Sequence, residues 1–181
     1  MSFQKEISEE QQRNWFRSID HSTNFYLIIT IGNNDVGVCN MKGINWDGRS
    51  GEGGIFIGDP RYLNTSVPVR AILNAATYFC DVLGIETVNI SIVEGNEQAV
   101  HFNQMLGAVE TSREDGLIRM YFTRGMLHNA TSTLIEDIGS RYTEEERVLT
   151  ISLERDFDKV LIQTRALQRL DHDPNKIQIL T

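Results

Sequence analysis

The order in which strand-like and helix-like segments follow one another constrains the fold of this chain more than any single motif. Runs of β-branched and aromatic residues at 25–31, 36–40 and 53–58 are typical of strands, and Gly/Asn/Asp clusters between them are typical of turns. Apolar residues then recur at helical spacing in two later segments, each of which ends at a glycine. A strand lies between these helices and a hairpin follows them, so residues 1–123 have a mixed α/β order.

The expected elements can be set out in chain order. They are a helix over 7–19 with Ser8 as N-cap, strands 25–31 and 36–40 joined as a hairpin, strand 53–58, a helix over 69–83 that Ser66 caps and Gly84 stops, strand 87–93, a helix that Asn96 or Gly95 caps and Gly107 ends, and strands 108–112 and 117–122 around the turn 113–116.

Composition narrows the class of protein. Seventeen basic residues against 25 acidic ones give a formal charge of −8 without a basic cluster, which disfavours nucleic acid as a partner. Cys39 and Cys80 lie among apolar residues and are expected to be buried free thiols, and no His/Cys spacing indicates a metal site. No run approaches the ~18 apolar residues of a membrane span, and no signal peptide is evident. The expected compartment is the cytoplasm.

The character of the chain changes at Arg124, so the segment 124–181 is interpreted as a C-terminal extension. Apolar residues recur at helical spacing from Leu149 to Leu170, which favours a helix, although 149–153 also alternates as a strand would. Residues 177–180 alternate in the same way after a turn at 173–175.

Several short motifs, taken in this order, resemble the GNAT superfamily of N-acetyltransferases. They are Gln12-x-x-Trp15-Phe16, Val36-Gly37-Val38, the segment from Glu52 to Asp59, Leu83-Gly84-Ile85-x-x-Val88, and Asn96-x-x-Ala99 with Leu106-Gly107. The nearest types are the ribosomal-protein-alanine and nucleotide-amino-sugar acetyltransferases. The resemblance covers residues 11–122, but the family's first strand and first helix have no counterpart here.

The resemblance implies a mixed, mostly antiparallel twisted sheet flanked by helices, with acetyl-CoA as co-substrate and no metal. In such a fold two neighbouring strands splay apart and the pantetheine pairs with the free edge of one, while the pyrophosphate sits at the next helix N-terminus. It therefore assigns cofactor binding to the strand, the helix entry and the later helix: Ile55, Phe56, Ile57, Leu63, Asn64, Thr65, Ser66, Val67, Asn96 and Asn103.

The sequence departs from the family pattern at the phosphate loop and at one helix position. The loop 63–68 contains no glycine, and Pro68 removes an amide donor. Asn103 stands where the family often has a Tyr that protonates the leaving thiolate, and an amide cannot do so. The loop therefore either binds acetyl-CoA or is degenerate. Asn96 either caps its helix alone or also contacts the cofactor.

Glu52 is the candidate general base, because an amine must lose a proton when it attacks a thioester. The structural alternative is that Glu52 pairs with Arg49 at a strand end. Asp47 and His101 are weaker candidates for the same role.

These observations leave three functions open. The preferred one is transfer of acetyl to a primary amine, on a nucleotide-linked amino sugar or a protein N-terminus. The second is a catalytically weak GNAT-like binding or assembly module, and the third is an unrelated α/β fold with an interaction role. The extension 124–181 either covers the edge of strand 25–31 with 148–153 or 176–180, from the same chain or a neighbour, or forms a helical appendage that packs elsewhere or mediates homodimerisation.

Overall fold

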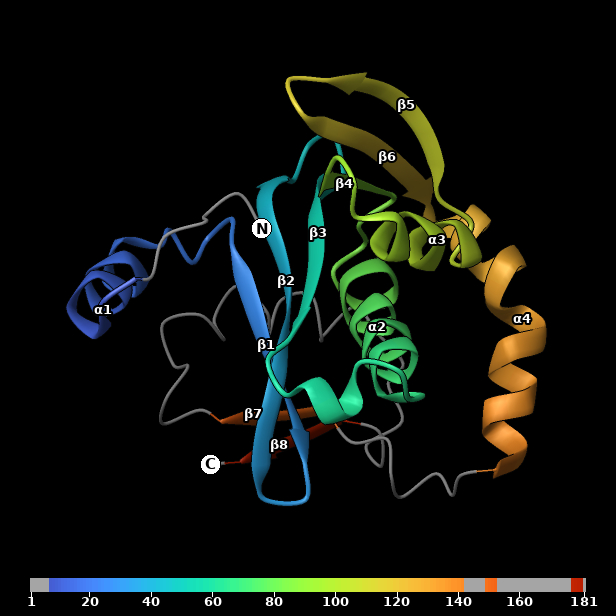
Figure 1. Ribbon diagram of the computed structural model, residues 1–181. Helices are drawn as coiled ribbons and strands as arrows, with labels where there is room; N and C mark the ends of the chain where they lie inside the picture. Colours follow the sequence, from blue (N-terminus) through green and yellow to red (C-terminus); the bar gives the residue numbers. More distant parts are fainter. Residues whose placement is uncertain (1–6, 142–148, 153–176, 181) are drawn as a thin grey trace.

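The computed structural model describes residues 7–141, 149–152 and 177–180, and its centre is one six-stranded sheet (Figure 1). The strand order is β1-β2-β3-β4-β6-β5. In this sheet β3 and β4 are parallel and the other neighbours are antiparallel. The elements are α1 (Glu9–Ser18), β1 (Phe25–Ile31), β2 (Asn34–Asn45), β3 (Ser50–Ile57), η1 (Pro60–Tyr62), α2 (Val67–Ala76), η2 (Thr77–Val82), β4 (Thr87–Val93), α3 (Glu97–Met105), β5 (Val109–Glu114), β6 (Leu117–Thr123), α4 (Arg124–Arg141), β7 (Leu149–Ser152) and β8 (Ile177–Leu180). The predicted mixed, mostly antiparallel fold class is confirmed.

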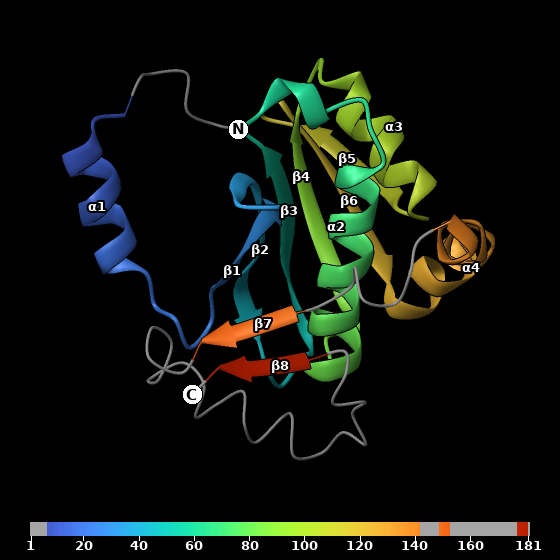
Figure 2. The ribbon, with the colours of Figure 1, turned by 90° about the horizontal axis from the view of Figure 1, so that it is seen from below.

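The two faces of the sheet are covered unequally. Helices α2, α3 and α4 lie on one side and α1 on the other (Figures 1 and 2). The helix face carries the core residues of the central strands, because successive side chains alternate between faces: Val88, Ile90, Ile92, Ile118, Met120 and Phe122. The intervening residues form what we call the open face: Tyr26, Asn40, Lys42, Glu52, Asn89, Ser91, Arg119 and Tyr121. None of the α1 residues is buried, and Trp15 packs edge-on against Tyr26 with ring centroids 5.6 Å apart.

The helix predicted over 69–83 is two elements. It starts as α2 and continues as a π-helical segment, η2, in which the Leu83 N–H donates to the Tyr78 carbonyl at 3.0 Å. The wider turn allows three consecutive side chains, Tyr78, Phe79 and Cys80, to be buried together. Gly84 then ends the segment at φ +75°, as predicted. Periodicity identified the helix but not the change in its hydrogen bonding.

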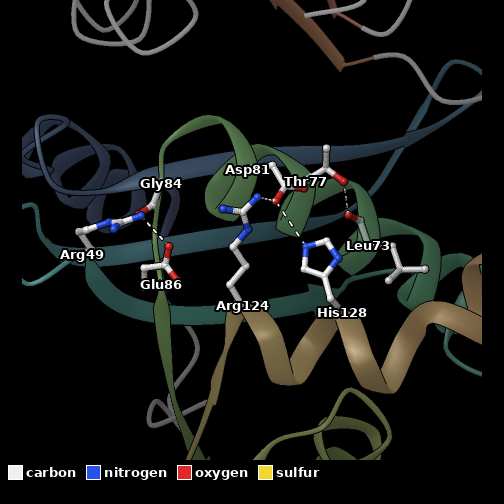
Figure 3. A network of polar contacts seen from close by, with 8 residues as sticks. All are labelled: Arg49, Leu73, Thr77, Asp81, Gly84, Glu86, Arg124 and His128. Carbon is white, nitrogen blue, oxygen red and sulfur yellow. Dashed lines mark hydrogen bonds and ion pairs between the residues drawn. The ribbon is translucent and has the colours of Figure 1, made fainter. Parts of the chain in front are cut away.

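A polar network joins the end of η2 to α4 and to the β2–β3 turn (Figure 3). Asp81 forms an ion pair with Arg124 at 2.7 Å, and Nε2 of His128 lies 3.4 Å from the same carboxylate oxygen. Arg49 donates to the Gly84 carbonyl at 2.9 Å and to Glu86 at 2.5 Å. These side chains are partly exposed, so each pair contributes roughly 0–1 kcal/mol. Their effect is to fix the loop between η2 and β4 against its neighbours.

The described parts of the C-terminal extension are a helix and a two-stranded sheet. α4 begins at Arg124, and β7 pairs in parallel with β8. Over 149–152 the favoured helix is therefore wrong, because the alternation of Leu149 and Ile151 with Thr150 and Ser152 lets this segment pair as a strand. The same-chain pairing of these segments with β1 is also not observed, since β1 is an outer strand and β7–β8 form their own sheet. The rest of the predicted helix, 153–170, lies outside the described residues.

Candidate functional site

Strands β3 and β4 separate part-way along their length, and this separation creates the candidate site. They pair in parallel only between 50–52 and 87–89. β3 stays paired with β2 as far as Ile57, and β4 stays paired with β6 as far as Val93. Beyond Glu52, one edge of β3 therefore faces β4 without a ladder of hydrogen bonds, as the family resemblance predicted.

A glycine occupies the point of separation. A Cβ atom at Gly53 would lie 2.6 Å from Cγ1 of Val88, so no side chain fits here without a shift of Val88. Val88 is in the core, and its side chain packs directly against the β3 backbone. Gly53 therefore serves the packing of the two strands where they begin to diverge.

A cavity of about 320 Å³ lies between the diverging strands. Ile72, Phe79 and Phe102 close it on the helix face. Asn40, Gly54 and Ser91 also line it, and these belong to the open face. The cavity thus has walls from both sides of the sheet. We call this cavity the cleft.

The structure places the predicted cofactor residues in three groups. Five line the cavity: Ile55, Ile57, Leu63, Asn96 and Asn103. Four lie in the loop and first turn of α2 beside it without lining it: Asn64, Thr65, Ser66 and Val67. Phe56 is 47% exposed and points to the face opposite Ile55 and Ile57. Sequence reasoning missed Asn40 and Ser91, because assigning them to the cleft requires the register of the strands.

The helix entry offers few backbone donors. The Thr65 hydroxyl accepts the Val67 N–H at 3.2 Å, and Pro68 has no N–H. The Thr65 N–H donates to the Tyr62 carbonyl at 3.3 Å. Arg61 is bound to Asp59, and its hydrogen bonds hold the pKa of that carboxyl below the ordinary value. In a glycine-rich loop the backbone N–H groups are free to bind a phosphate. In this chain the N–H groups of Thr65 and Val67 already donate to acceptors within the loop.

Two asparagines of α3 face the cavity. Asn96 caps the helix by accepting the Ala99 N–H at 3.1 Å, as predicted, and also lines the cavity. Asn103 donates its Nδ2 to the Ala99 carbonyl at 2.8 Å. Gln98 of the same helix donates to Asn64 at 3.4 Å, which links α3 to the loop before α2. α3 and that loop therefore enclose one end of the cleft.

Glu52 lies on the open face where β3 and β4 part. Its carboxylate is 3.2 Å from Nζ of Lys42 on β2, and both side chains are about half exposed. The alternative pairing of Glu52 with Arg49 is wrong, because Arg49 binds Glu86. Lys42 is instead directly opposite Glu52 in the strand register. Asp47 and His101 are exposed and do not line the cavity.

Other chemistry is limited in the described part of the chain. Cys39 and Cys80 are buried free thiols, as predicted, and burial raises their pKa values to about 12 and about 11. The described residues contain no group of three or more His, Cys, Asp or Glu arranged to hold a metal ion. Among the helices described, none combines the length and apolar character needed to cross a membrane.

Comparison with solved structures identifies the fold. A spermidine N-acetyltransferase from Vibrio cholerae in complex with CoA and spermine superposes with a TM-score of 0.58 at 21% identity, over 67% of this chain and 79% of that one. A manganese complex of the Vibrio cholerae enzyme gives 0.57 at 21% identity, over 67% and 77%. A dodecameric form gives 0.52 at 22% identity, over 65% and 72%. This likeness shows that the chain shares the fold of these spermidine N-acetyltransferases.

Sequence comparison adds no closer relative. No protein-family model matches the chain, and no curated protein matches it. The three structures are polyamine acetyltransferases by name, so they do not support either of the two types, ribosomal-protein-alanine and nucleotide-amino-sugar, suggested by the sequence motifs.

Proposed function

We propose that this chain binds acetyl-CoA in the cleft between β3 and β4 and transfers its acetyl group to a primary amine. The observation that carries the proposal is the unpaired edge of β3 beyond Glu52, which runs along a cavity of about 320 Å³. An extended chain of amide groups can pair with such an edge as an added strand does. Pantetheine is a chain of this kind, and one of the structures with this fold contains CoA.

The residues of the cleft fit the pantetheine better than the phosphates. Ile55, Ile57 and Phe102 give apolar walls, and the Asn103 Oδ1 can accept an N–H while its Nδ2 is held by Ala99. The phosphates would lie at the entry to α2, beside Asn64, Thr65 and Ser66. Because the Val67 amide is already used and Pro68 has none, we expect weaker phosphate binding than at a glycine-rich loop.

The chemistry requires one proton to be removed and one to be supplied. The amine nitrogen attacks the thioester carbonyl carbon, the C–N bond forms, and the C–S bond breaks with its electron pair on sulfur. Glu52 is the proposed base that takes the nitrogen's proton, directly or through one water. Asn103 cannot supply the thiolate's proton, so we assign that proton to solvent. Backbone amides near Phe56 and Ile57 are the proposed donors to the carbonyl oxygen.

The acceptor amine is the open part of this proposal. The sequence resemblance favours a nucleotide-linked amino sugar or a protein N-terminus, whereas the solved structures of this fold are named for spermidine. An acceptor screen should therefore contain all three classes. We propose a cytoplasmic enzyme, with residues 1–123 as the transferase domain and 124–181 as an extension. The first helix of that extension, α4, packs on the domain through Leu127, and homodimerisation is one proposed role of the extension.

The second candidate is a catalytically weak binding or assembly module of the same fold. The internal use of the Val67 amide and the replacement of a proton donor by Asn103 favour it. The two candidates differ in whether acetyl-CoA is consumed.

Calorimetric titration with acetyl-CoA, followed by assay of CoA release in the presence of amines, separates these candidates. The transferase proposal expects micromolar binding and amine-dependent release. Glu52→Gln should lower kcat by roughly 10²-fold or more while leaving acetyl-CoA affinity unchanged. Glu110→Gln is the matched control, because Glu110 pairs with Arg113 on the β5–β6 hairpin. Binding without turnover would favour the module, and an active Glu52→Gln enzyme would remove Glu52 from the base role.

A further inference from the structure

Arg119 is a charged side chain beside the cleft that the proposed reaction does not use. It lies on β6, directly opposite Ser91 of β4 in the strand register, and its Nη1 donates to the Ser91 hydroxyl at 2.6 Å. Ser91 lines the cavity. The hydrogen bond therefore holds the guanidinium at the rim of the cleft, on the same face as Glu52.

The guanidinium has no carboxylate partner within the part of the chain that the structure describes. Five other arginines form ion pairs there: Arg13, Arg49, Arg61, Arg113 and Arg124. Arg119 uses one N–H group on Ser91, and a guanidinium has five. Its remaining donors keep the fork geometry that suits a carboxylate or phosphate.

The charged side chains near this rim have both signs. Lys42 and Arg119 are positive, and Glu52 is negative and already paired with Lys42 at 3.2 Å. Glu114 of β5 lies on the same face as Arg119 in the β5–β6 register, and its carboxylate accepts the Ser112 hydroxyl at 3.0 Å. Each of these two carboxylates therefore has a partner other than Arg119, whose remaining donors face the acceptor side of the cleft.

From this placement we infer that the acceptor carries an anionic group, a carboxylate or a phosphate, which Arg119 binds while the amine reaches Glu52. The inference rests on the proposed transferase function and concerns its substrate class. Asn89, which pairs with Glu52, and Ser91, which pairs with Arg119, are two residues apart on β4, about 7 Å along the strand. Glu52 and Arg119 are also two strand spacings apart across the sheet, so their Cα atoms are separated by roughly 12 Å. Both side chains are long and shorten the gap that one acceptor, with an amine and an anion, has to span. A polycationic amine has no anion for Arg119 and brings a further cation to it.

The experiment compares amines that differ only in an anion. Glucosamine 6-phosphate is paired with glucosamine, and 5-aminopentanoate with pentylamine, while spermidine represents the polycations. For each pair the ratio of kcat/KM values is measured in the wild type, Arg119→Gln and Arg119→Glu. Arg113→Gln is the matched control, because Arg113 lies on the adjacent strand and is engaged with Glu110.

We expect the wild type to have a higher kcat/KM for the anionic member of at least one pair. Comparison of the phosphate pair with the carboxylate pair then shows which anion the site prefers. Arg119→Gln should reduce the ratio of kcat/KM values for that pair about tenfold or more, because the variant loses a hydrogen bond between two charged groups, and such bonds are stronger than those between neutral groups. Arg119→Glu should shift selection toward spermidine, and Arg113→Gln should change neither ratio.

Turnover whose ratios ignore Arg119, or a wild type that prefers spermidine, would overturn this inference and leave the transferase proposal standing. A purely structural role of Arg119 would lower both members of a pair alike, and this result would also overturn it. Absence of acetyl-CoA binding and of turnover with every amine would overturn both.

Discussion

At the scale of single residues, Gly37 determines how closely β2 and β3 can approach. It pairs with Ile57 on one side and Ile29 on the other. A Cβ atom here would overlap the backbone carbonyl oxygen of Phe56 and lie 3.2 Å from Cδ1 of Ile29. A backbone atom cannot rotate away as a side chain can. We expect Gly37→Ala to lower the free energy of unfolding by about 1–3 kcal/mol in urea denaturation.

Gly125→Ala is the control for this substitution. Gly125 lies in α4 with no atom within 4 Å of a Cβ position. Alanine should therefore raise the free energy of unfolding by about 0.5–1 kcal/mol, through helix propensity and loss of unfolded-chain entropy. If Gly37→Ala and Gly125→Ala change the free energy of unfolding equally, the strands adjust to a Cβ atom at Gly37 without loss of stability, and the prediction is wrong.

The contacts of a site residue were predictable from the sequence where its partner is only a few residues away. Asn96 caps α3 with a residue three positions away, so the sequence alone indicates that contact. The partner of Glu52 was not predictable, because Lys42 faces it only through the register of two strands. Asn40, Ser91 and Arg119 were missed for the same reason. The sequence around each residue does not reveal the register between strands that are distant in the chain, and this register decides which side chains lie next to one another.

At the scale of elements, α3 depends on its cap. Asn96 is the N-cap and its side chain accepts the Ala99 N–H at 3.1 Å. The helix has only nine residues, so the unsatisfied donors of its first turn are a large part of its hydrogen bonding. We expect Asn96→Ala to lower the free energy of unfolding by about 0.5–2 kcal/mol, measured by urea denaturation.

Gln104→Ala tests whether that loss belongs to the cap. Gln104 is exposed on the same helix, and alanine is a good helix former, so its effect should stay within about 0.5 kcal/mol. If Gln104→Ala is as destabilising as Asn96→Ala, the helix responds to truncation in general and the cap has no special effect.

The positions of helices and strands were predictable where the spacing of apolar residues and the turn-forming residues at the ends of a segment indicate the same bounds. Strands β1 and β4 match the expected ranges 25–31 and 87–93. β2 is longer than the expected 36–40, because its partners β1 and β3 support pairing from Asn34 to Asn45. The π-helical segment η2 was not predicted, since it depends on burying Tyr78, Phe79 and Cys80 together. At 149–152 the strand forms because a partner, β8, lies far along the chain.

At the scale of the whole molecule, the core reaches into α4. The main cluster of buried residues runs from Phe25 to Leu127, and Thr131 on the next turn of α4 is also buried. Gly107 lies against this helix, because a Cβ there would be 2.9 Å from the Met126 carbonyl oxygen. Helix α4 is therefore part of the packed sheet-and-helix unit, although sequence character places a boundary before it.

Because α4 contributes to the core, we expect two truncated forms of the protein to differ in stability. Residues 1–141 keep every core residue that the structure describes, so we expect a soluble protein with one cooperative thermal transition. Residues 1–123 lose Leu127 and uncover the core beside it, and a buried leucine alone is worth about 2–5 kcal/mol. We expect this shorter chain to unfold at a much lower temperature or to precipitate. Leu127→Ala in the full chain should reproduce part of the loss. A stable 1–123 would show that α4 is dispensable, whereas aggregation of 1–141 as well would assign the protective role to residues after 141.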